Sequence, residues 1–191
     1  MSESGGSPDE SQPEPRPDLK RARRQKTTVD LTKIDRLPPH SIEAEQGILG
    51  CILLSPQDSI GICIEKLKSG ADSFYDLRHQ TLYEQLAKMY DAKEPVDLIT
   101  LQQRLKDAGQ LDAVGGLTYL MTLQDAVPSA ANLEYYVTIV RDKFVLRRML
   151  QTCSGVISRV QEQEGEVDAL LDEVERDILR IGEDHTRVEF Q

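Results

Sequence analysis

From residue 41 onward, the apolar positions of the chain recur at the spacing of an α-helix. A first helix should begin after Ser41, which can cap its free backbone N–H groups, because Pro38-Pro39 stops any helix arriving from the N-terminal side. Residues 48–54 are all apolar or glycine, so this half of the helix must be buried on most sides. Gly47 and Gly50 leave room for another backbone to come close. The stretch therefore predicts the first core helix of the fold.

The same stretch carries two acidic residues in its first helical turn. The helix dipole favours negative charge at Glu43 and Glu45. Because these residues are only two positions apart, their side chains point to different helix faces and do not form a carboxylate pair. We interpret both as capping and packing residues and not as catalytic carboxylates.

Four more helices are predicted before residue 131. Small polar or acidic residues, prolines and glycines mark their starts and ends. The predicted helices cover residues 57–68, 77–92, 99–108 and 117–126. No sustained alternation of apolar and polar residues with a period of two is bounded by turns, so we predict no β-strand.

The longest helix is predicted from about residue 131 to 163, far beyond the mean of about 11–12 residues for globular proteins. It carries two apolar stripes that are displaced around its axis. A helix that is apolar on two faces has two neighbours. The first stripe is Leu133, Tyr136, Val137, Val140 and Phe144, and the second is Leu146, Met149, Leu150, Cys153, Val156, Ile157 and Val160.

A last helix is predicted over residues 166–181, after a tight reversal at Gly165. Its apolar residues recur at spacings of three and four, which is the pattern of a coiled-coil seam. The seam consists of Val167, Leu170, Leu171, Val174, Ile178 and Ile181. The two long helices should form an antiparallel hairpin that follows a compact head of about five helices, so the predicted fold class is all-α.

The second stripe of the longest helix gives the hairpin a surplus of apolar residues. Leu150 and Val156 lie on a helix that already has a core-facing stripe, so they are candidates for an interaction surface. The alternative is that this stripe packs only against its own hairpin partner. Arg147 and Arg148 can flank such a contact or simply keep the segment soluble.

Residues 1–36 are rich in Ser, Pro, Asp, Glu and Arg and hold few large apolar residues, so we predict a disordered tail. The predicted organisation is this tail, a globular helical head over residues 37–130, the hairpin over 131–182, and a C-terminal end over 183–191. The basic run Lys20–Lys26 could contact nucleic acid or an acidic partner, or only solubilise the tail.

Charge is distributed unevenly between tail and body. The first 36 residues carry eight basic and seven acidic side chains, which leaves 15 basic and 26 acidic side chains, a net charge of −11, for the rest. So acidic a body is a poor non-specific binder of nucleic acid, whose affinity depends on Lys and Arg neutralising phosphates. A protein partner with a basic surface is the more plausible ligand.

The residues that carry chemistry form no recognisable set. No phosphate-binding loop of the form Gly-x-x-x-x-Gly-Lys-Ser/Thr occurs. The three histidines are widely spaced, so no zinc site is predicted, and we interpret His79 as a surface or boundary residue. Cys51, Cys63 and Cys153 lie in apolar helical contexts and are predicted to be reduced and buried. No stretch approaches the length of a membrane span, and we predict no catalytic, cofactor-binding or metal-binding residue.

Several motifs in this order resemble the opening of DnaB-type replicative DNA helicases. The motifs are Leu37-Pro38-Pro39-His40-Ser41-Ile42-Glu43-Ala44-Glu45-Gln46 with Gly50 and Leu53-Leu54, His79-Gln80, Glu94-Pro95-Val96-Asp97-Leu98, Gly115-Gly116-Leu117-Thr118-Tyr119-Leu120, Ala126-Val127-Pro128-Ser129-Ala130-Ala131-Asn132, and Tyr135-Tyr136 followed by Arg147-Arg148. The resemblance runs from about residue 36 to 182, and many ordered matches make it highly specific.

The resemblance implies an all-helical N-terminal domain in which paired hairpins make dimers and three dimers form a collar on a hexameric ring. Such a collar is non-catalytic and binds primase. It also affects binding of the helicase loader, and it contacts DNA only indirectly. In the family, ATP and Mg²⁺ belong to a C-terminal ATPase domain that makes the full-length protein an ATP-dependent DNA helicase. This sequence ends where the linker to that domain would begin. The implied location is the cytoplasm, with no membrane partner.

The resemblance also implies sites. The primase-facing surface would fall on Tyr119, Arg147, Arg148, Leu150 and Val156, and the dimer seam on Val167, Leu170, Leu171, Val174 and Ile178. An alternative is a stand-alone adaptor of the same fold that binds primase or a helicase. The reading frame beyond Gln191 would separate the two.

Overall fold

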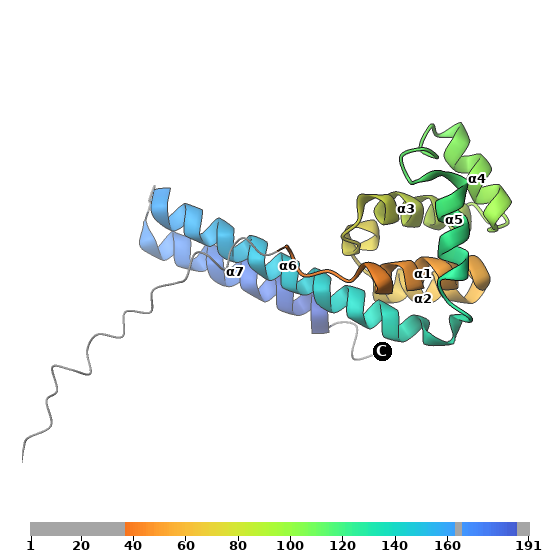
Figure 1. Cartoon of the computed structure of the whole chain (residues 1–191). Coiled ribbons are helices and arrows are strands. Elements are labelled where there is room, and N and C mark those ends of the chain that lie inside the picture. The colour runs from red at the N-terminus through yellow and green to blue at the C-terminus, as the bar shows by residue number, and fades with distance from the viewer. Residues whose placement is uncertain (1–36, 163–165, 187–191) are drawn as a thin grey trace, which may run out of the picture. The chain divides into compact units, whose positions relative to one another are not determined.

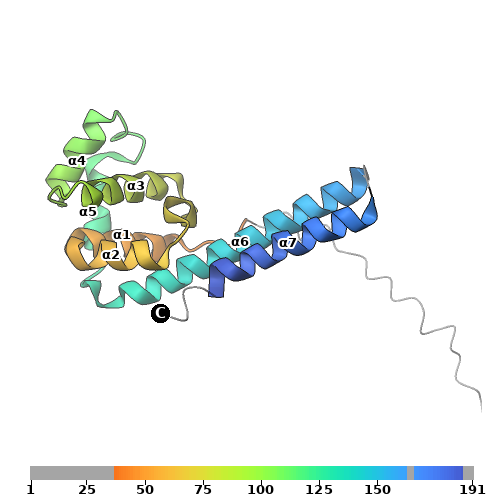
Figure 2. The ribbon, with the colours of Figure 1, turned by 180° about the vertical axis from the view of Figure 1, so that it is seen from behind.

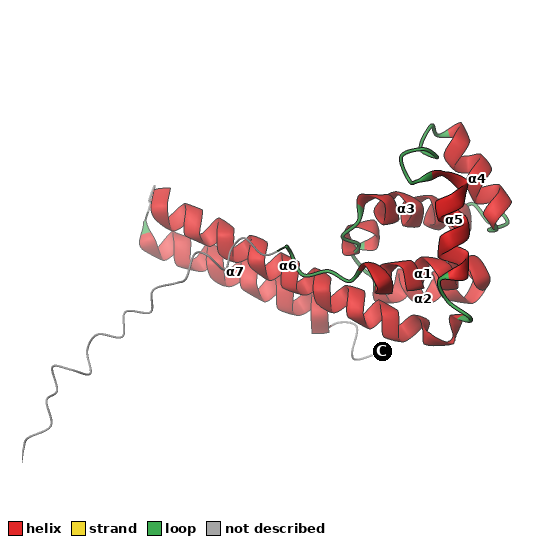
Figure 3. Cartoon of the chain, viewed as in Figure 1, coloured by secondary structure: helices red, strands yellow, loops and turns green. Residues whose placement is uncertain are grey.

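The computed structural model describes residues 37–162 and 166–186, and all regular secondary structure in these two ranges is helical (Figures 1 and 3). Contacts divide the chain into two units, Met1–Leu37 and Pro38–Gln191, and the fold is that of the second unit. The tail predicted over residues 1–36 lies outside the described residues, so its predicted disorder stays a prediction. The predicted all-α class is confirmed.

Helix α1, Ile42–Leu54, is the centre of the head. Its N-terminus is capped as the sequence predicts, with the backbone N–H of Ala44 donating to Ser41 Oγ at 3.3 Å. The helix is buried along most of its length and contacts α2, α3, α5 and α6. It therefore gives α2, α3, α5 and the first part of α6 a common packing surface, as Figures 1 and 2 show from opposite sides, while α4 packs on α3 and α5.

Glycine lets two neighbours approach α1 closely. A Cβ atom at Gly50 would lie 2.5 Å from the backbone oxygen of Leu123 on α5, which confirms the close backbone approach predicted there. At Gly47 the neighbour is different, because a Cβ atom would lie 2.8 Å from the ring of Tyr136 on α6.

The remaining helices of the head begin and end within about two residues of their predicted bounds. Asp76 caps α3 by accepting from the N–H of Arg78, and Asp97 forms a capping box with Thr100 at the start of α4. The elements are α2 Pro56–Lys66, the 3₁₀ turn η2 Gly70–Ser73, α3 Leu77–Asp91, α4 Leu98–Asp107, α5 Gly116–Asp125 and the 3₁₀ turn η3 Ala130–Asn132.

Helices α6, Leu133–Glu162, and α7, Val167–Thr186, form the predicted antiparallel hairpin (Figure 2). The first turns of α6 pack on α1 through Leu133, Val137 and Val140, which are buried. The reversal predicted at Gly165 lies outside the described residues. Within the described ranges, no helix is both long enough and apolar enough to cross a membrane.

Candidate functional site

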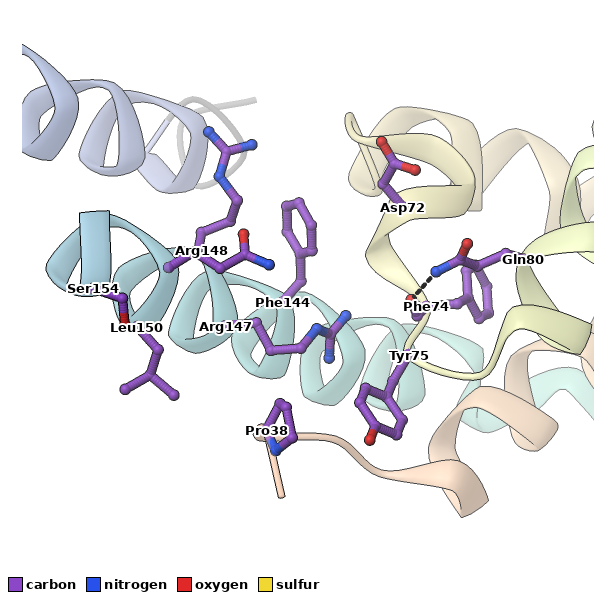
Figure 4. Close-up of a pocket in the computed structure, with 11 residues that line it drawn as sticks. Pro38, Asp72, Phe74, Tyr75, Gln80, Phe144, Arg147, Arg148, Leu150 and Ser154 are labelled. Atoms are coloured by element: carbon purple, nitrogen blue, oxygen red, sulfur yellow. Dashed lines mark hydrogen bonds between the residues drawn. The ribbon is translucent and has the colours of Figure 1, made fainter. Parts of the chain in front are cut away.

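A cavity of about 730 Å³, which we call the junction pocket, lies where the head meets the hairpin. Its walls come from Pro38, from residues 72–80 around the start of α3, and from residues 144–154 of α6. Figure 4 shows the α6 side chains Phe144 and Arg147 facing the connector that carries Phe74 and Tyr75. The pocket thus combines aromatic rings with two adjacent arginines.

Arg147 is held rigidly at one side of the junction pocket. Its Nη1 donates to the backbone oxygen of Pro39 at 2.8 Å and its Nη2 to that of Ser73 at 2.6 Å. The guanidinium carbon lies 5.7 Å from the ring centres of both Tyr75 and Phe144. Burial lowers the pKa of Arg147 from its ordinary value, and the negative charge of Glu45 opposes this shift.

The next residue, Arg148, is held by one ring alone. Its guanidinium carbon lies 5.9 Å from the ring centre of Phe144. Within the described part of the chain, Arg148 makes no hydrogen bond or ion pair. Leu150, three residues after Arg147 on α6, leaves 54% of its surface exposed and points to the other side of the helix from Arg148 (Figure 4). Arg147, Arg148 and Leu150, three of the predicted primase-facing residues, all line the junction pocket.

The other two predicted primase-facing residues are placed differently. Val156 is half-buried on α6, two turns beyond Leu150. Tyr119 is half-buried on α5, and its hydroxyl group takes part in a polar cluster inside the head. Neither residue lines the junction pocket.

The polar cluster is a chain of three side chains, Glu45, His79 and Tyr119, from helices α1, α3 and α5. Glu45 Oε2 lies 2.7 Å from His79 Nδ1, and His79 Nε2 lies 2.7 Å from Tyr119 Oη. The Glu45 carboxyl group and the Tyr119 hydroxyl group thus each bond to one of the two ring nitrogens of His79. The side-chain amide of Gln46 also donates to this hydroxyl, at 3.3 Å.

One sequence-based interpretation is wrong at this cluster. His79 is not a surface or boundary residue, because its exposed fraction is 0%. Glu45, interpreted as a capping and packing residue of the first turn, is 1% exposed and also accepts from the backbone N–H groups of Tyr75 and Asp76. With both groups closed to solvent, the cluster acts as a structural cross-link between three helices.

The helical spacing of the apolar residues indicates that both positions are buried. His79 stands three and four residues before Leu82 and Tyr83, so it lies on the buried face of α3. Glu45 stands three and four residues before Ile48 and Leu49, on the buried face of α1. A buried acid and a buried base on neighbouring helices are expected to be paired.

A second concave surface, the hairpin groove, lies between α6 and α7. It has a volume of about 460 Å³ and an almost wholly apolar lining. Met149 is 48% exposed and Ile178 57% exposed, so large apolar groups face solvent along it. The lining residues are Val145, Met149, Thr152 and Cys153 from α6 and Ile178, Ile181 and Gly182 from α7.

The predicted seam of α7 divides into two rows. Leu170 and Val174 are half-buried and Ile181 is buried, so this row is covered within the chain. Val167, Leu171 and Ile178 form the second row and are each more than half exposed. The hairpin therefore covers only one side of the seam.

Of the three cysteines that were predicted to be buried, one is exposed. Cys51 and Cys63 are buried as predicted, but Cys153 is exposed in the hairpin groove. Burial raises the pKa of the Cys63 thiol to about 12 and also raises that of Cys51. Cys153 is therefore the solvent-accessible thiol of the three. No group of three or more His, Cys, Asp or Glu side chains in residues 37–162 and 166–186 is placed to hold a metal ion.

Comparison with known proteins relates this fold to one family. The family model named DnaB-like helicase N terminal domain matches residues 37–142. The replicative DNA helicase DnaB of Geobacillus stearothermophilus is 40% identical over 149 residues, which are 78% of this chain and 32% of that protein. The replicative DNA helicase DnaC of Bacillus subtilis is 40% identical over 157 residues, 82% of this chain and 34% of that protein. The chain thus spans about a third of the length of these relatives.

Solved structures agree with this relationship. The crystal structure of the N-terminal domain of DnaB helicase from Mycobacterium tuberculosis is 34% identical, with a TM-score of 0.70, and the match covers 75% of this chain and 99% of that chain. A structure of a DnaB-like replicative helicase, described with its interactions with primase, matches with a TM-score of 0.61 over 74% of this chain and 31% of that chain. At 22% identity, the second match shows the fold alone.

Proposed function

This chain belongs to the family of DnaB-like helicase N-terminal domains, and from that premise we propose that it acts as the non-catalytic collar of a replicative DNA helicase. Its work would be to assemble copies of the chain and to dock a protein partner. ATP, Mg²⁺ and the unwinding reaction would belong to an ATPase domain, and this chain would hold no cofactor of its own. The relatives are named replicative DNA helicases, so the proposed location is the cytoplasm, where bacterial DNA is copied.

The observation that carries the assembly role is the hairpin groove. The exposed apolar residues of the groove and of the second α7 row lie on the same hairpin. Burying them removes apolar surface from water, which stabilises an association by about 25 cal/mol per Å² before the entropy of association is subtracted. A second copy of the hairpin supplies a matching apolar surface. We propose that hairpins pair into dimers and that dimers build the hexameric collar.

Sedimentation equilibrium of the chain tests the pairing. Wild type should form a reversible dimer, and Met149→Asp should weaken the dimer at least about tenfold, because a charge would have to be desolvated in the groove. Ile99→Asp is the matched control, since Ile99 is 76% exposed on the head and lies in the first turn of α4. A wild-type chain that stays monomeric at high concentration contradicts the proposal.

The proposed docking partner is primase, with the helicase loader as a second partner that affects the same collar. Support comes from the cluster of Arg147, Arg148 and Leu150, which the structure places at one exposed pocket. The solved helicase with the same fold is described with its interactions with primase, which is a statement about that protein. The acidic body argues that any contact with DNA is indirect.

Capture of primase by the immobilised chain tests the docking surface. Leu150→Asp should lower capture at least about tenfold while the helical circular dichroism stays unchanged, because Leu150 is exposed and the fold does not depend on it. Tyr119→Ala should also lower capture, but through loss of its bond to His79. Ile99→Asp should capture like wild type. Unchanged capture by both test variants would refute the assigned surface.

A further inference from the structure

The junction pocket holds two guanidinium groups that form no ion pair within the described residues. Six arginines are half-buried in residues 37–162 and 166–186. Four of them lie within 4.0 Å of a carboxylate, namely Arg78, Arg104, Arg141 and Arg159. Arg147 and Arg148 do not, and both line the junction pocket.

This absence is notable because carboxylates are abundant. Outside the first 36 residues, 26 acidic side chains accompany 15 basic ones. Asp72 lies at the opposite side of the junction pocket, but within the described residues it forms no ion pair with either arginine. A partly desolvated charge gains from an anionic partner, so the pair of guanidinium groups favours an anion from outside the chain.

The pocket also fixes where an anion would bind. Both Nη atoms of Arg147 are tied to backbone oxygens, and its ring contacts hold the guanidinium in place. Arg148 stacks on the same Phe144 ring and keeps its hydrogen-bond donors free. Pre-ordered donors cost less entropy to use than mobile ones.

Beside the two arginines, the pocket lining includes large apolar groups as well as polar ones. Phe144 is half-buried between the two arginines, and Leu150 exposes half of its surface at the rim. A free inorganic anion would leave these groups in water. A ligand that joins a carboxylate to a large apolar group would use both parts of the surface.

We propose that the junction pocket binds a short peptide segment of a protein partner in which an acidic side chain stands next to a large apolar one. The carboxylate pairs with Arg148 and with the charge of Arg147, and the apolar side chain packs on Phe144. The inference rests on the proposed function, since it names the chemistry of the partner that docks there. Nucleic acid fits less well, because two guanidinium groups neutralise few phosphates on a body of net charge −11.

The test uses the full chain, labelled with ¹⁵N, and a minimal probe. Acetyl-aspartyl-leucyl-phenylalanine amide, which has no terminal charge, is titrated while backbone amide shifts are recorded. Shifts should concentrate at residues 72–75 and 144–151. The asparagine form of the probe should bind about tenfold more weakly, because it keeps the shape of the acid and lacks its charge.

Arg148→Gln is the decisive variant, because Arg148 has no hydrogen bond or ion pair in the described chain that its loss would break. It should bind the aspartyl probe about tenfold more weakly and leave binding of the asparagine probe unchanged. Arg176→Gln on the exposed face of α7 is the control for loss of one positive charge and should bind as wild type does.

The outcomes separate this inference from the proposed function. Equal binding of the two probes, or no shifts with either, overturns the inference even if Leu150→Asp abolishes primase capture. Binding of a short oligothymidylate at the same residues, lost in Arg148→Gln, overturns the choice of a peptide. A charge-dependent aspartyl shift without any primase capture supports the pocket chemistry and removes primase as its partner.

Discussion

At the scale of single residues, Tyr119 has a structural role that its predicted place on a docking surface does not reveal. Its hydroxyl group occupies the only open nitrogen of His79, whose other nitrogen meets Glu45. The guanidinium group of Arg78 lies 4.5 Å from the centre of the Tyr119 ring, so Tyr119 has a cation–π contact on its ring as well as a hydrogen bond at its hydroxyl group. Substitutions at Tyr119 therefore change α5 packing before they change any surface.

Tyr119→Phe isolates the hydroxyl group. The variant leaves His79 Nε2 buried without a partner, so the free energy of unfolding should fall by about 1–3 kcal/mol. Urea unfolding followed by circular dichroism, at one protein concentration, measures this change. The matched control is Tyr135→Phe, because Tyr135 is 68% exposed, and it should change stability by less than about 0.5 kcal/mol. Equal losses in the two variants would contradict the cross-link.

Local signals in the sequence predicted the caps but not this cluster. Ser41 and Asp76 cap the helices that they precede, because a cap depends on residues within one turn. Glu45 and His79 are 34 positions apart, and their bond depends on how α1 packs against α3. Helical periodicity is consistent with a buried face for each residue, contrary to the interpretation of His79 as a surface or boundary residue, and it does not show which partner each one contacts.

At the scale of helices, two glycines in helix interiors have opposite surroundings. Gly50 lies where α1 meets the backbone of α5, and Gly155 lies on α6 with open space around it. Glycine lowers the stability of a helix interior by roughly 0.5–1 kcal/mol relative to alanine, so a close neighbour is what makes glycine necessary. The sequence pointed to close packing at Gly50, and the structure names Leu123 as the neighbour.

The two glycines give a paired prediction. Gly155→Ala should raise the free energy of unfolding by roughly 0.5–1 kcal/mol, because nothing lies within 4 Å of the new methyl group. Gly50→Ala should lower it by about 1–3 kcal/mol, because the methyl group would meet a backbone oxygen that cannot move away alone. Thermal and urea unfolding measure both. Stabilisation by both variants would mean that α1 and α5 are less closely packed than the structure shows.

The hairpin shows how far the sequence can predict which molecule covers the apolar faces of a helix. The second stripe of α6 and the seam of α7 predicted two faces to cover, and the structure leaves Leu150, Leu171 and Ile178 exposed. Whether such residues meet a second copy depends on another molecule, which no periodicity encodes. The same limit applies to Cys153, which follows the apolar pattern and yet faces solvent in the hairpin groove.

At the scale of the whole molecule, pairing through the hairpin would link the stability of the chain to its concentration. A dimer that binds only the folded chain stabilises it by mass action, and a hundredfold rise in concentration above the dissociation constant adds roughly 2–3 kcal/mol. For a chain of 191 residues this raises Tm by about 5–10 °C. The hairpin groove is the surface through which the effect would act.

Scanning calorimetry at two concentrations a hundredfold apart measures the shift. Met149→Asp should show nearly the same Tm at both concentrations, and at low concentration it should match wild type, because Met149 is half exposed and contributes little to the isolated fold. Ile99→Asp should keep the full concentration dependence. If Met149→Asp instead lowers Tm equally at both concentrations, Met149 supports the hairpin of one chain, and the groove is not where two chains meet.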